Sequence, residues 1–396
     1  MGAGTADAIV IGGGLHGCSA AINMAGRGLS VIVIEKDFVG RHASSSNAGG
    51  VRTLGRDPRE IPLALMSLDL WHAIDTIVGE DCGFDAGGQL RLAETEEDLE
   101  TLKARAAGVR DLGYDHEEII GTDELYEILP ELRPGCVGAL FCRRDGSANP
   151  LYAMRAYRRA VIAAGVALHE GTAATGAQRR DGAWHVATTG GDFQAPVLVN
   201  CAGAWADRVA AWTGDRVPMT AAAPSAMITS RVPPCLGPVV SSAARPLSLK
   251  QLENGTVLIS GALRGVADRD ANSAVIRLAP FAARAATVLD LFPAMAGAQV
   301  VRFWAGIEAI TPDGSPVLGP GASEEGVFHA FGFNGHGFEL GPGCGAVIAE
   351  LVATGSTNTP IAGLEVGRFQ STGIGADASA YGAPEQEKGE GYAANQ

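Results

Sequence analysis

The chain has 396 residues, of which 46% are hydrophobic, and this length suffices for one large domain or two ordinary ones. Its 30 Lys and Arg against 44 Asp and Glu give a formal net charge of −14 at pH 7, which argues against a nucleic-acid or anionic-membrane partner. No apolar run reaches the roughly 18 residues of a membrane-spanning helix, so no transmembrane segment is expected.

The cysteines and the N-terminus bear on cofactors and location. None of the seven cysteines forms a C-x-x-C pair, so the sequence predicts neither a zinc nor an iron–sulfur site, and no metal is expected. The stretch MGAGTADAIVIGGG has no basic region before its apolar run, which indicates no signal peptide. An odd, dispersed set of cysteines fits a reducing cytosol, and we expect a cytoplasmic protein.

The first elements of the chain predict a βαβ unit. Residues 8–11 and 30–34 are apolar runs typical of buried strands, and residues 15–27 between them have the small, apolar composition of a packed helix. Gly26 and Gly28 mark the end of that helix.

The later elements are read from the same patterns. We expect helices at 58–79 and 150–166, short strands near 166–175 and 183–189, a buried strand at 197–200, and mixed short strands and charged helices over 80–146. Residues 216–304 read as a largely β layer, and 326–355 as strand, glycine-rich loop and helix. The polar residues 375–396 read as a disordered tail.

The glycines after the first strand predict a dinucleotide site. Gly12, Gly14 and Gly17 fit G-x-G-x-x-G between a strand and a helix, where they permit a tight turn, close approach of a pyrophosphate and close helix packing. The helix N-terminus adds unpaired N–H groups for the phosphates. Glu35 ends the second strand and is placed to accept hydrogen bonds from a ribose. The alternative is a glycine-rich turn that only packs a helix on a sheet.

Five stretches, in order along the chain, resemble a known family. They are IVIGGGLHG, IEKDFVGRHASSSNAGGVR, VLVNCAGAWA, WAGIEAITPDGSPVLG and FGFNGHGFELGPGCG. Together they resemble the D-amino-acid-oxidase-like FAD-dependent oxidoreductases, which include glycine oxidase, sarcosine oxidase and β subunits of bacterial amino-acid dehydrogenases. The resemblance covers about residues 5–372. It implies an α/β fold with a Rossmann-like, glutathione-reductase-type FAD-binding domain and an interleaved β-rich substrate domain.

The resemblance also implies where FAD and the domains lie. The FAD-binding domain would comprise 1–80, 147–215 and 305–374, and the substrate domain 81–146 and 216–304. The stretch at 44–50 offers hydroxyls, an amide and backbone N–H groups for a ribityl chain. The expected cofactor residues are Gly12, Gly14, Leu15, His16, Gly17, Glu35, Lys36, Ser44, Ser45, Ser46, Asn47, Ala48, Gly49, Gly50, Ala174, Ala202, Gly203, Trp205, Gly306, Gly332, Asn334, Gly335, His336 and Gly337.

Arg52 and His336 are the candidate catalytic residues that the motifs single out directly. Arg52 resembles the position where sarcosine oxidases place an arginine for the substrate carboxylate, which a guanidinium binds bidentately; the alternative is a surface salt bridge. His336 either contacts the flavin or braces the loop at 331–343. That loop precedes a helix whose N-terminus would face the flavin pyrimidine ring and stabilise negative charge there.

Three departures from the family pattern shape the expected chemistry. Glu308 stands where glycine-oxidase-like members have a carboxylate-binding arginine, so it would hold an amine or hydroxyl instead, near Trp304. Carboxylate binding then depends on Arg52, helped by Lys250 or Arg245. No cysteine occurs at 308–315, which predicts non-covalent FAD. No lysine stands in the VLISG strand, which favours a dehydrogenase over an oxidase.

The predicted reaction is oxidation of an amino acid or cyclic imino acid at its C–N bond. By resemblance to β subunits of D-hydroxyproline, proline and opine dehydrogenases, the first substrate is cis-4-hydroxy-D-proline, with sarcosine, glycine or an opine as alternatives. An electron acceptor or partner subunits in a hetero-oligomer are compatible with this reading. Two other classes stay open: an NAD-dependent dehydrogenase, and a non-catalytic FAD-binding subunit of a larger assembly.

Overall fold

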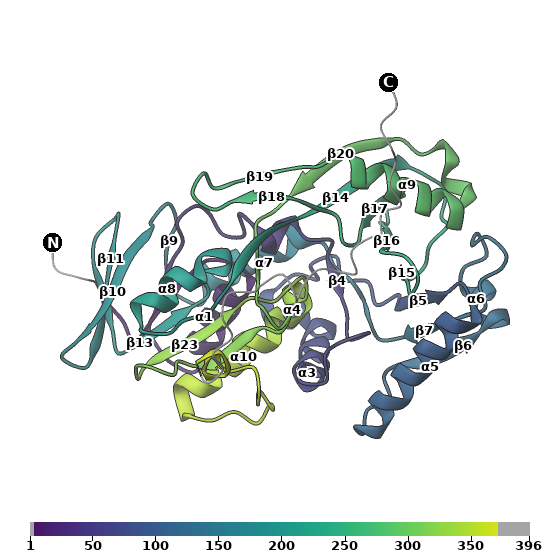
Figure 1. Cartoon of the computed structure of the whole chain (residues 1–396). Coiled ribbons are helices and arrows are strands. Elements are labelled where there is room, and N and C mark those ends of the chain that lie inside the picture. Colours follow the sequence, from purple (N-terminus) through teal and green to yellow (C-terminus); the bar gives the residue numbers. More distant parts are fainter. Residues whose placement is uncertain (1–3, 371–396) are drawn as a thin grey trace.

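The computed structural model describes residues 4–370, so the tail predicted at 375–396 lies outside the described residues. In Figure 1 the six-stranded sheet, with β13 and β23, lies toward the left, and β5, β6 and β7 of the eleven-stranded sheet lie at the right; the long strand β14 (Thr220–Arg231) of this second sheet extends across the middle. A cavity lies where the two sheets meet.

The first sheet has six strands in the order β22-β23-β13-β2-β3-β9. Its bounds are β22 Val317–Pro320, β23 Val327–Phe331, β13 Val197–Asn200, β2 Ala8–Ile11, β3 Val31–Ile34 and β9 Ala167–His169. All neighbours are parallel except β22 and β23. Every residue of β2 and β3 is buried, which is why both read as continuous apolar runs.

The second sheet has eleven strands. Nine follow the order β19-β18-β14-β17-β16-β15-β5-β7-β6, and β20 and β21 pair with β14. Besides β14, its strands are β19 Ser273–Val275, β18 Arg264–Asp268, β17 Thr256–Ser260, β16 Ser248–Gln251, β15 Val239–Ser242, β5 Gln89–Ala93, β7 Gly138–Cys142, β6 Glu118–Gly121, β20 Val300–Ala305 and β21 Glu308–Ile310.

Two smaller sheets complete the strands. One joins β1 (Gly4–Thr5), β12 (Phe193–Ala195), β11 (Ala183–Thr188) and β10 (Ala174–Arg180). The other pairs β4 (Gly50–Val51) with β8 (Gly146–Ser147), so that Val51 lies opposite Gly146.

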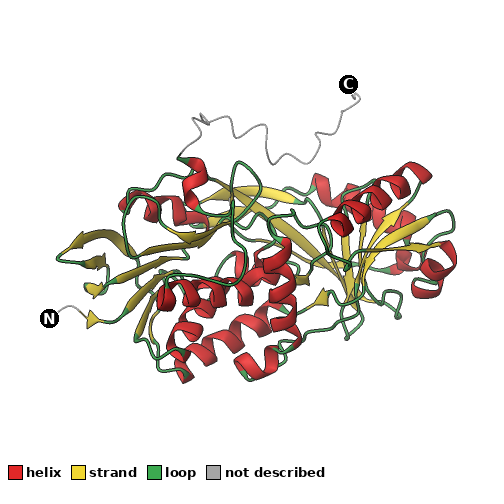
Figure 2. Ribbon diagram, turned by 90° about the horizontal axis from the view of Figure 1, so that it is seen from below, coloured by secondary structure: helices red, strands yellow, loops and turns green. Residues whose placement is uncertain are grey.

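Helices cover one side of the six-stranded sheet and the far end of the molecule (Figure 2). The α-helices are α1 Leu15–Gly26, α2 Ala43–Ser46, α3 Ile61–His72, α4 Ile74–Val78, α5 Glu96–Asp111, α6 Thr122–Ile128, α7 Pro150–Ala163, α8 Ala206–Trp212, α9 Ala279–Leu291 and α10 Gly337–Thr354. The 3-10 helices are η1 Gly203–Trp205, η2 Pro293–Gly297 and η3 Val366–Phe369. Helices α1, α3, α7 and α10 share one apolar core with the six-stranded sheet.

The structure differs from two expectations about these elements. The helix predicted over 58–79 is two helices, α3 and α4, that meet at Ala73, whose φ of −114° and ψ of 19° leave the helical region. The layer at 216–304, expected to be largely β, also contains α9. Val288 and Leu291 of α9 are buried against the eleven-stranded sheet. Tertiary packing therefore stabilises this helix, which the alternating apolar residues on either side of it did not indicate.

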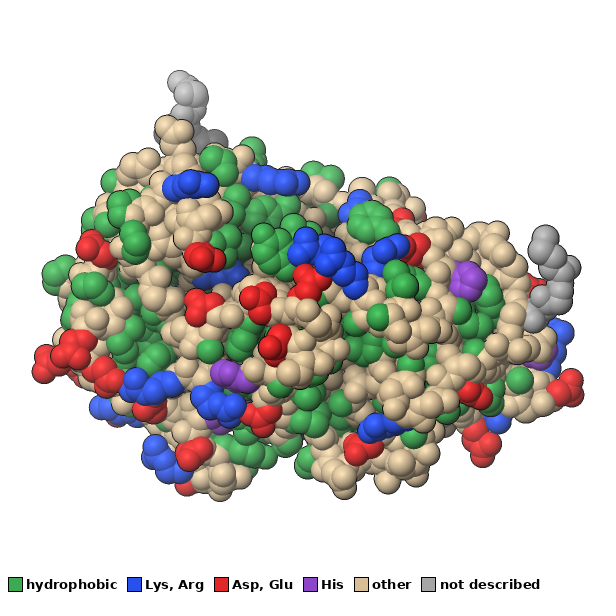
Figure 3. Space-filling model, turned by 180° about the vertical axis from the view of Figure 1, so that it is seen from behind, with side chains coloured by type: hydrophobic (Ala, Val, Ile, Leu, Met, Phe, Trp, Pro, Cys, Tyr) green, Lys and Arg blue, Asp and Glu red, His purple; other side chains and the backbone are tan. Residues whose placement is uncertain are grey.

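The surface matches the dispersed charge of the sequence. On the face shown in Figure 3, acidic and basic side chains are interspersed rather than gathered by sign. No helix within residues 4–370 combines the length and apolarity that crossing a membrane requires.

Candidate active site

A cavity of about 1070 Å³ lies between the carboxyl ends of the parallel strands and one face of the eleven-stranded sheet. Ligands of open α/β sheets bind at these strand ends. Ile11, Glu35, Ala202 and Phe331, which end or follow four different strands of the six-stranded sheet, all line the cavity.

The glycines after β2 leave no room for side chains. A Cβ at Gly12 would lie 2.2 Å from the carbonyl oxygen of Cys201, and the φ of Gly12 is +111°. A Cβ at Gly17 would lie 1.9 Å from the carbonyl oxygen of Gly12, so helix α1 packs directly on the turn. Gly14 is the N-cap of α1 and offers no capping side chain. The turn therefore presents backbone rather than side chains to the cavity, which allows a pyrophosphate to approach closely.

Glu35 closes this turn from the end of β3. Its Oε2 accepts a hydrogen bond from Gly13 N at 2.7 Å, and its Oε1 accepts one from Asp37 N at 2.8 Å. Burial raises the pKa of the Glu35 carboxyl. A carboxylate has about four acceptor sites, so Glu35 keeps capacity for a ribose hydroxyl. The geometry of the turn and of Glu35 fits a bound dinucleotide.

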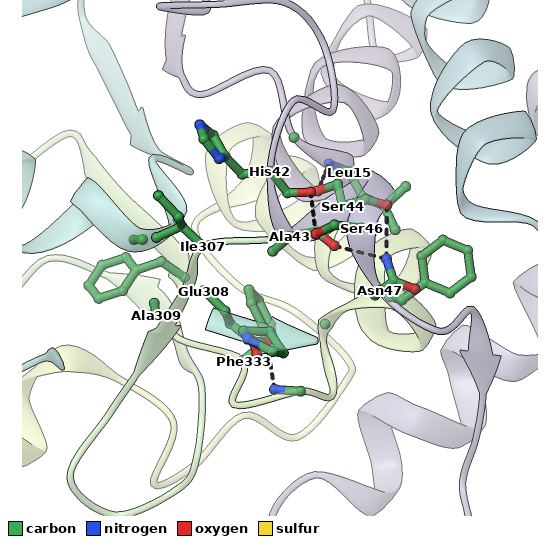
Figure 4. Close-up of a pocket in the computed structure, with 18 of the residues that line it drawn as sticks. Leu15, His42, Ala43, Ser44, Ser46, Asn47, Ile307, Glu308, Ala309 and Phe333 are labelled. Carbon is green, nitrogen blue, oxygen red and sulfur yellow. Dashed lines mark hydrogen bonds between the residues drawn. The ribbon is translucent and has the colours of Figure 1, made fainter. Parts of the chain in front are cut away.

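Residues 43–50 form a polar wall of the cavity (Figure 4). The hydroxyl of Ser44 accepts a hydrogen bond from Leu15 N at 3.0 Å, which joins this wall to the start of α1. Asn47 Nδ2 donates to the carbonyls of Ala43 and Ser44, both at 2.9 Å. Ser44, Ser46, Asn47, Ala48, Gly49 and Gly50 line the cavity, whereas Ser45 does not.

Two predicted residues support this wall from outside the cavity. The indole N–H of Trp304 donates to the carbonyl oxygen of Ser46 at 2.8 Å. A Cβ at Gly306 would lie 1.7 Å from the Ser46 hydroxyl, so the turn between β20 and β21 presses directly on α2. Neither residue is part of the cavity lining.

The glycine-rich loop at 332–337 forms the opposite wall. Asn334, at φ 53°, donates to Gly332 O at 2.6 Å and accepts from Thr311 N at 2.9 Å. Glu308 Oε1 accepts from Gly335 N at 2.6 Å (Figure 4), and burial raises the pKa of Glu308. Glu308 therefore braces this loop and also lines the cavity.

His336 caps helix α10 and lies in a buried charge cluster. Its Nδ1 is 3.0 Å from Glu60 Oε2, and Glu60 is fully buried. Burial lowers the pKa of His336 from 6.5 to about 4, so its imidazole is neutral at pH 7. The proton then sits on Nδ1 and the hydrogen bond to Glu60 fixes the ring.

His16, at the start of α1, is a second neutral imidazole beside this loop. Its ring stacks on Phe333 with centroids 3.7 Å apart, and burial lowers its pKa to about 3.

The two arginines after the polar wall differ in their partners. Arg56 is 1% exposed and donates to Glu339 Oε2 at 3.0 Å and, through Nε, to the carbonyl oxygen of Arg52 at 2.8 Å. The guanidinium of Arg52 makes no hydrogen bond or ion pair within the described residues, and it lines the cavity. Burial and the nearby Arg56 lower the pKa of Arg52 to about 10, so it remains a cation.

The two other predicted carboxylate helpers lie elsewhere. Arg245 pairs with Glu94 at 2.6 Å and with Asp290 at 2.8 Å, and is not in the lining, so the structure does not bring it to the site. Lys250 lies behind the polar wall, where its Nζ donates to Ala148 O at 3.1 Å. Burial lowers the pKa of Lys250 to about 7.

The hairpin of β18 and β19 (Figure 1) contributes Arg269, Asp270 and Asn272 to the lining of the cavity. Asn272 at its tip accepts from Lys36 Nζ at 2.5 Å and donates to Asp37 at 3.1 Å. The carbonyl of Arg269 accepts from the indole N–H of Trp205 at 3.1 Å. The hairpin thus ties the eleven-stranded sheet to the loops that follow β3 and β13.

The remaining predicted cofactor residues line the same cavity. They are Leu15, Lys36, Ala174, Ala202, Gly203, Trp205 and Gly337. Gly17 lies behind the turn, where it serves the packing of α1.

Sequence reasoning missed several polar residues of the site. Glu60, Glu339 and Arg56 form the buried charge cluster, and Gln89 enters from β5. Arg56 could have been suspected from its position four residues after Arg52. The other residues reach the site through contacts between distant segments, which the sequence does not indicate. Within residues 4–370 no group of three or more His, Cys, Asp or Glu side chains is placed to hold a metal ion.

Comparisons with known proteins agree with this geometry. A family model described as FAD dependent oxidoreductase (DAO) matches residues 7–351. The chain is 31% identical to glycine oxidase of Geobacillus kaustophilus over 87% of this chain and 92% of that protein. It is 25% identical to an opine oxidase subunit of Rhizobium meliloti over 92% and 98% of the two chains. The crystal structure of L-proline dehydrogenase from P. horikoshii superposes with a TM-score of 0.86 at 26% identity, covering 93% of this chain and 98% of that one.

Proposed function

Because the chain belongs to the DAO family of FAD-dependent oxidoreductases, we propose that it is a dehydrogenase for a secondary or cyclic amino acid. The predicted family and α/β fold class are confirmed, and FAD is the cofactor. The protein oxidises amino acids at the C–N bond. The names glycine oxidase and L-proline dehydrogenase each specify oxidation of an amino acid. The finer choices below are proposals.

The chain's own residues divide the work of the reaction. The turn at Gly12 and Gly14 and the carboxylate of Glu35 would hold the pyrophosphate and a ribose, and residues 44–50 would line the ribityl chain. FAD, when bound, accepts the hydride that leaves the substrate Cα. The loop at 332–337 and the N-terminus of α10 supply backbone N–H groups and a positive dipole end at the opposite wall.

The single observation that carries the substrate class is the unpaired guanidinium of Arg52 in the cavity wall. A guanidinium without a protein partner in a closed site matches a carboxylate. We propose that Arg52 binds the substrate carboxylate while the neutral amine gives up a hydride from Cα and becomes a protonated imine, which releases its N–H proton to water. The imine product then hydrolyses, or persists if it is cyclic.

The positions of the lysine side chains support a dehydrogenase rather than an oxidase. Within the described lining the one lysine is Lys36, which Asp37 and Asn272 hold at the Glu35 end. Lys250 lies behind the wall. We therefore expect the reduced enzyme to pass electrons to a dye much faster than to oxygen. Peroxide formation at air saturation as fast as dye reduction would make it an oxidase.

For the substrate we propose cis-4-hydroxy-D-proline first, with sarcosine, glycine or an opine as alternatives. The match to L-proline dehydrogenase supports a cyclic imino acid, and the matches to glycine oxidase and to the opine oxidase of Rhizobium meliloti support the alternatives. Relatives named as subunits also support a hetero-oligomer in which a partner receives the electrons.

An anaerobic screen of amino acids for flavin bleaching tests the proposal. A cyclic imino acid should bleach the flavin within seconds and glycine more slowly. A flavin that no amino acid reduces would indicate a non-catalytic FAD-binding subunit, and a colourless protein that binds NAD would contradict the FAD assignment itself.

A further inference from the structure

Gln89, the first residue of β5, has an amide whose orientation is settled by its neighbours. Its Nε2 donates to Gly146 O at 2.8 Å and to Val51 O at 3.2 Å. These two carbonyls belong to residues that lie opposite each other in the β4–β8 pair. Both amide hydrogens are thereby used, so the remaining atom of the amide, Oε1, is an acceptor that cannot exchange roles with Nε2.

The carbonyl Oε1 of Gln89 is available to a ligand. It accepts no hydrogen bond within the described residues, although the side chain is only 5% exposed. The oxygen is not completely enclosed by protein atoms. Gln89 lines the cavity, and with Nε2 held by two carbonyls, Oε1 is the one polar atom of its side chain that has no protein partner within the described residues.

Gln89 stands directly beside the residues that hold flavin and carboxylate in the proposed function. A Cβ at Gly50, the last residue of the polar wall, would lie 3.5 Å from Gln89 Nε2. One of the two carbonyls that accept from Gln89 Nε2 belongs to Val51, the residue before Arg52. The sheet holds the backbone of Gln89 on both sides, through Val239 of β15 and Cys142 of β7.

The pair of Arg52 and Gln89 is complementary to an amino acid. Arg52 is a donor without an acceptor, which suits a carboxylate, and Gln89 Oε1 is an acceptor without a donor, which suits an N–H. A neutral secondary amine has one N–H. When this N–H donates its hydrogen to an acceptor, the lone pair on nitrogen stays free to assist the departure of hydride from Cα.

We propose that Gln89 binds the substrate nitrogen: its Oε1 accepts a hydrogen bond from the amine N–H and so makes the site specific for amines that carry one. This assignment rests on the proposed function, since it requires an amino-acid substrate. It makes Gln89 a specificity-determining residue that contacts the substrate, and it excludes ligands with an acceptor at that position.

Two unreactive ligands of the same shape test the assignment by binding alone. Pyrrole-2-carboxylate carries a ring N–H beside its carboxylate, and 2-furoate carries a ring oxygen there. Both would be titrated into the FAD-loaded enzyme, with Kd read from the flavin absorbance difference. We expect the wild type to favour pyrrole-2-carboxylate by about tenfold, the usual contribution of one such hydrogen bond.

The variants separate recognition from structure. Gln89→Leu should bind the two ligands with equal Kd, whereas Arg52→Lys should weaken both by the same factor and keep the preference. Arg245→Ala, outside the cavity, should match the wild type. If Gln89→Leu weakens both ligands alike and keeps the preference, Gln89 only supports β4 and β8, and the assignment is wrong.

The same titration distinguishes a failure of the proposed function. A wild type that binds both carboxylates with equal Kd, yet is bleached by an amino acid, overturns the role of Gln89 and leaves the proposed function standing. A wild type that binds neither ligand and is bleached by no amino acid overturns both.

Discussion

Arg56 and Glu339 are 283 positions apart, yet Arg56 Nη2 donates to Glu339 Oε2 at 3.0 Å in the interior of the protein. Both side chains are essentially inaccessible, so Glu339 partners the Arg56 guanidinium in the cavity wall, with Glu60 Oε2 3.8 Å away on its other side. Arg52, four residues earlier in the chain, has no such partner within residues 4–370. The pairing leaves Arg52 as the arginine of the two that has no side-chain partner.

Replacing Arg52 should impair the reaction of carboxylate substrates. Losing a charged, hydrogen-bonded pair in a closed site costs about 2–5 kcal/mol, which is roughly 30-fold or more in kcat/KM. Arg52→Lys should recover part of this loss, since an ammonium lacks the planar fork. Steady-state kinetics on variants with full FAD content measure it, with Arg245→Ala as the control. An Arg52→Ala enzyme that loses less than about threefold would remove Arg52 from the site.

Alanine at Gly12 should abolish FAD retention. The φ of +111° is unfavourable for alanine, and its Cβ would overlap the carbonyl of Cys201 at 2.2 Å. We expect Gly12→Ala to purify colourless. The matched control is Gly26→Ala at the end of the same helix, where a Cβ meets nothing within 4 Å and should be neutral or slightly stabilising. The ratio of flavin to protein absorbance compares them, and a yellow Gly12→Ala protein would contradict the predicted pyrophosphate turn.

Acid should release FAD from the protein. Cys201 is the one cysteine among the described residues that line the cavity, and burial raises its pKa to about 12, so it is a thiol rather than a reactive thiolate. After precipitation with trichloroacetic acid, the yellow colour should stay in the supernatant. Colour in the pellet would show covalent attachment.

Loosening the β18–β19 hairpin should speed FAD release. Asn272→Gly removes the bonds to Lys36 and Asp37 and tolerates the φ of 54° at this position. We expect dissociation about tenfold faster, followed by the rise of flavin fluorescence on dilution, since two hydrogen bonds involving charged groups are lost. Asp181→Gly is the matched control, because Asp181 has a φ of 50° in an exposed turn away from the cavity. Equal rates for both variants would mean that the hairpin does not retain FAD.

The buried histidines His16 and His336 should each contribute a loss of stability as pH falls below about 6.5, opposed in part by the raised pKa of the buried carboxyls of Glu35 and Glu308. Burial lowers the pKa of His16 from 6.5 to about 3 and that of His336 to about 4. Between pH 6.5 and 4 the unfolded chain binds protons at these positions and the folded chain does not. The contribution of these two histidines to the free energy of unfolding is therefore fully present above pH 6.5. It is lost on acidification, at up to about 1.4 kcal/mol per pH unit for each histidine.

Urea unfolding across pH 4–7.5 measures this slope. His16→Gln should flatten it, and His185→Gln, on strand β11 of the small sheet, should leave it unchanged. A His16→Gln protein with the wild-type slope would show that His16 is not the buried neutral group responsible.

The βαβ unit and its glycine turn could be predicted from the amino-acid sequence. Strands β2 and β3 coincide with the predicted apolar runs to within one residue, and α1 ends one residue early, at Gly26. These elements are predictable because their signals are local: Gly12, Gly17 and Glu35 act within one short stretch of chain, where apolar periodicity and glycine geometry operate directly.

The partners of the charged groups around the cavity could not be predicted, because they depend on contacts between distant segments. Glu339 pairs with Arg56, Glu308 with Gly335 N, and Arg245 with Glu94, and none of these partners is indicated by spacing. Burying a charge is costly unless it finds a partner, so the choice of partner follows from which segments the two sheets bring together. That choice leaves the guanidinium of Arg52 and the side-chain carbonyl of Gln89, two residues that line the cavity, without protein partners within the described residues.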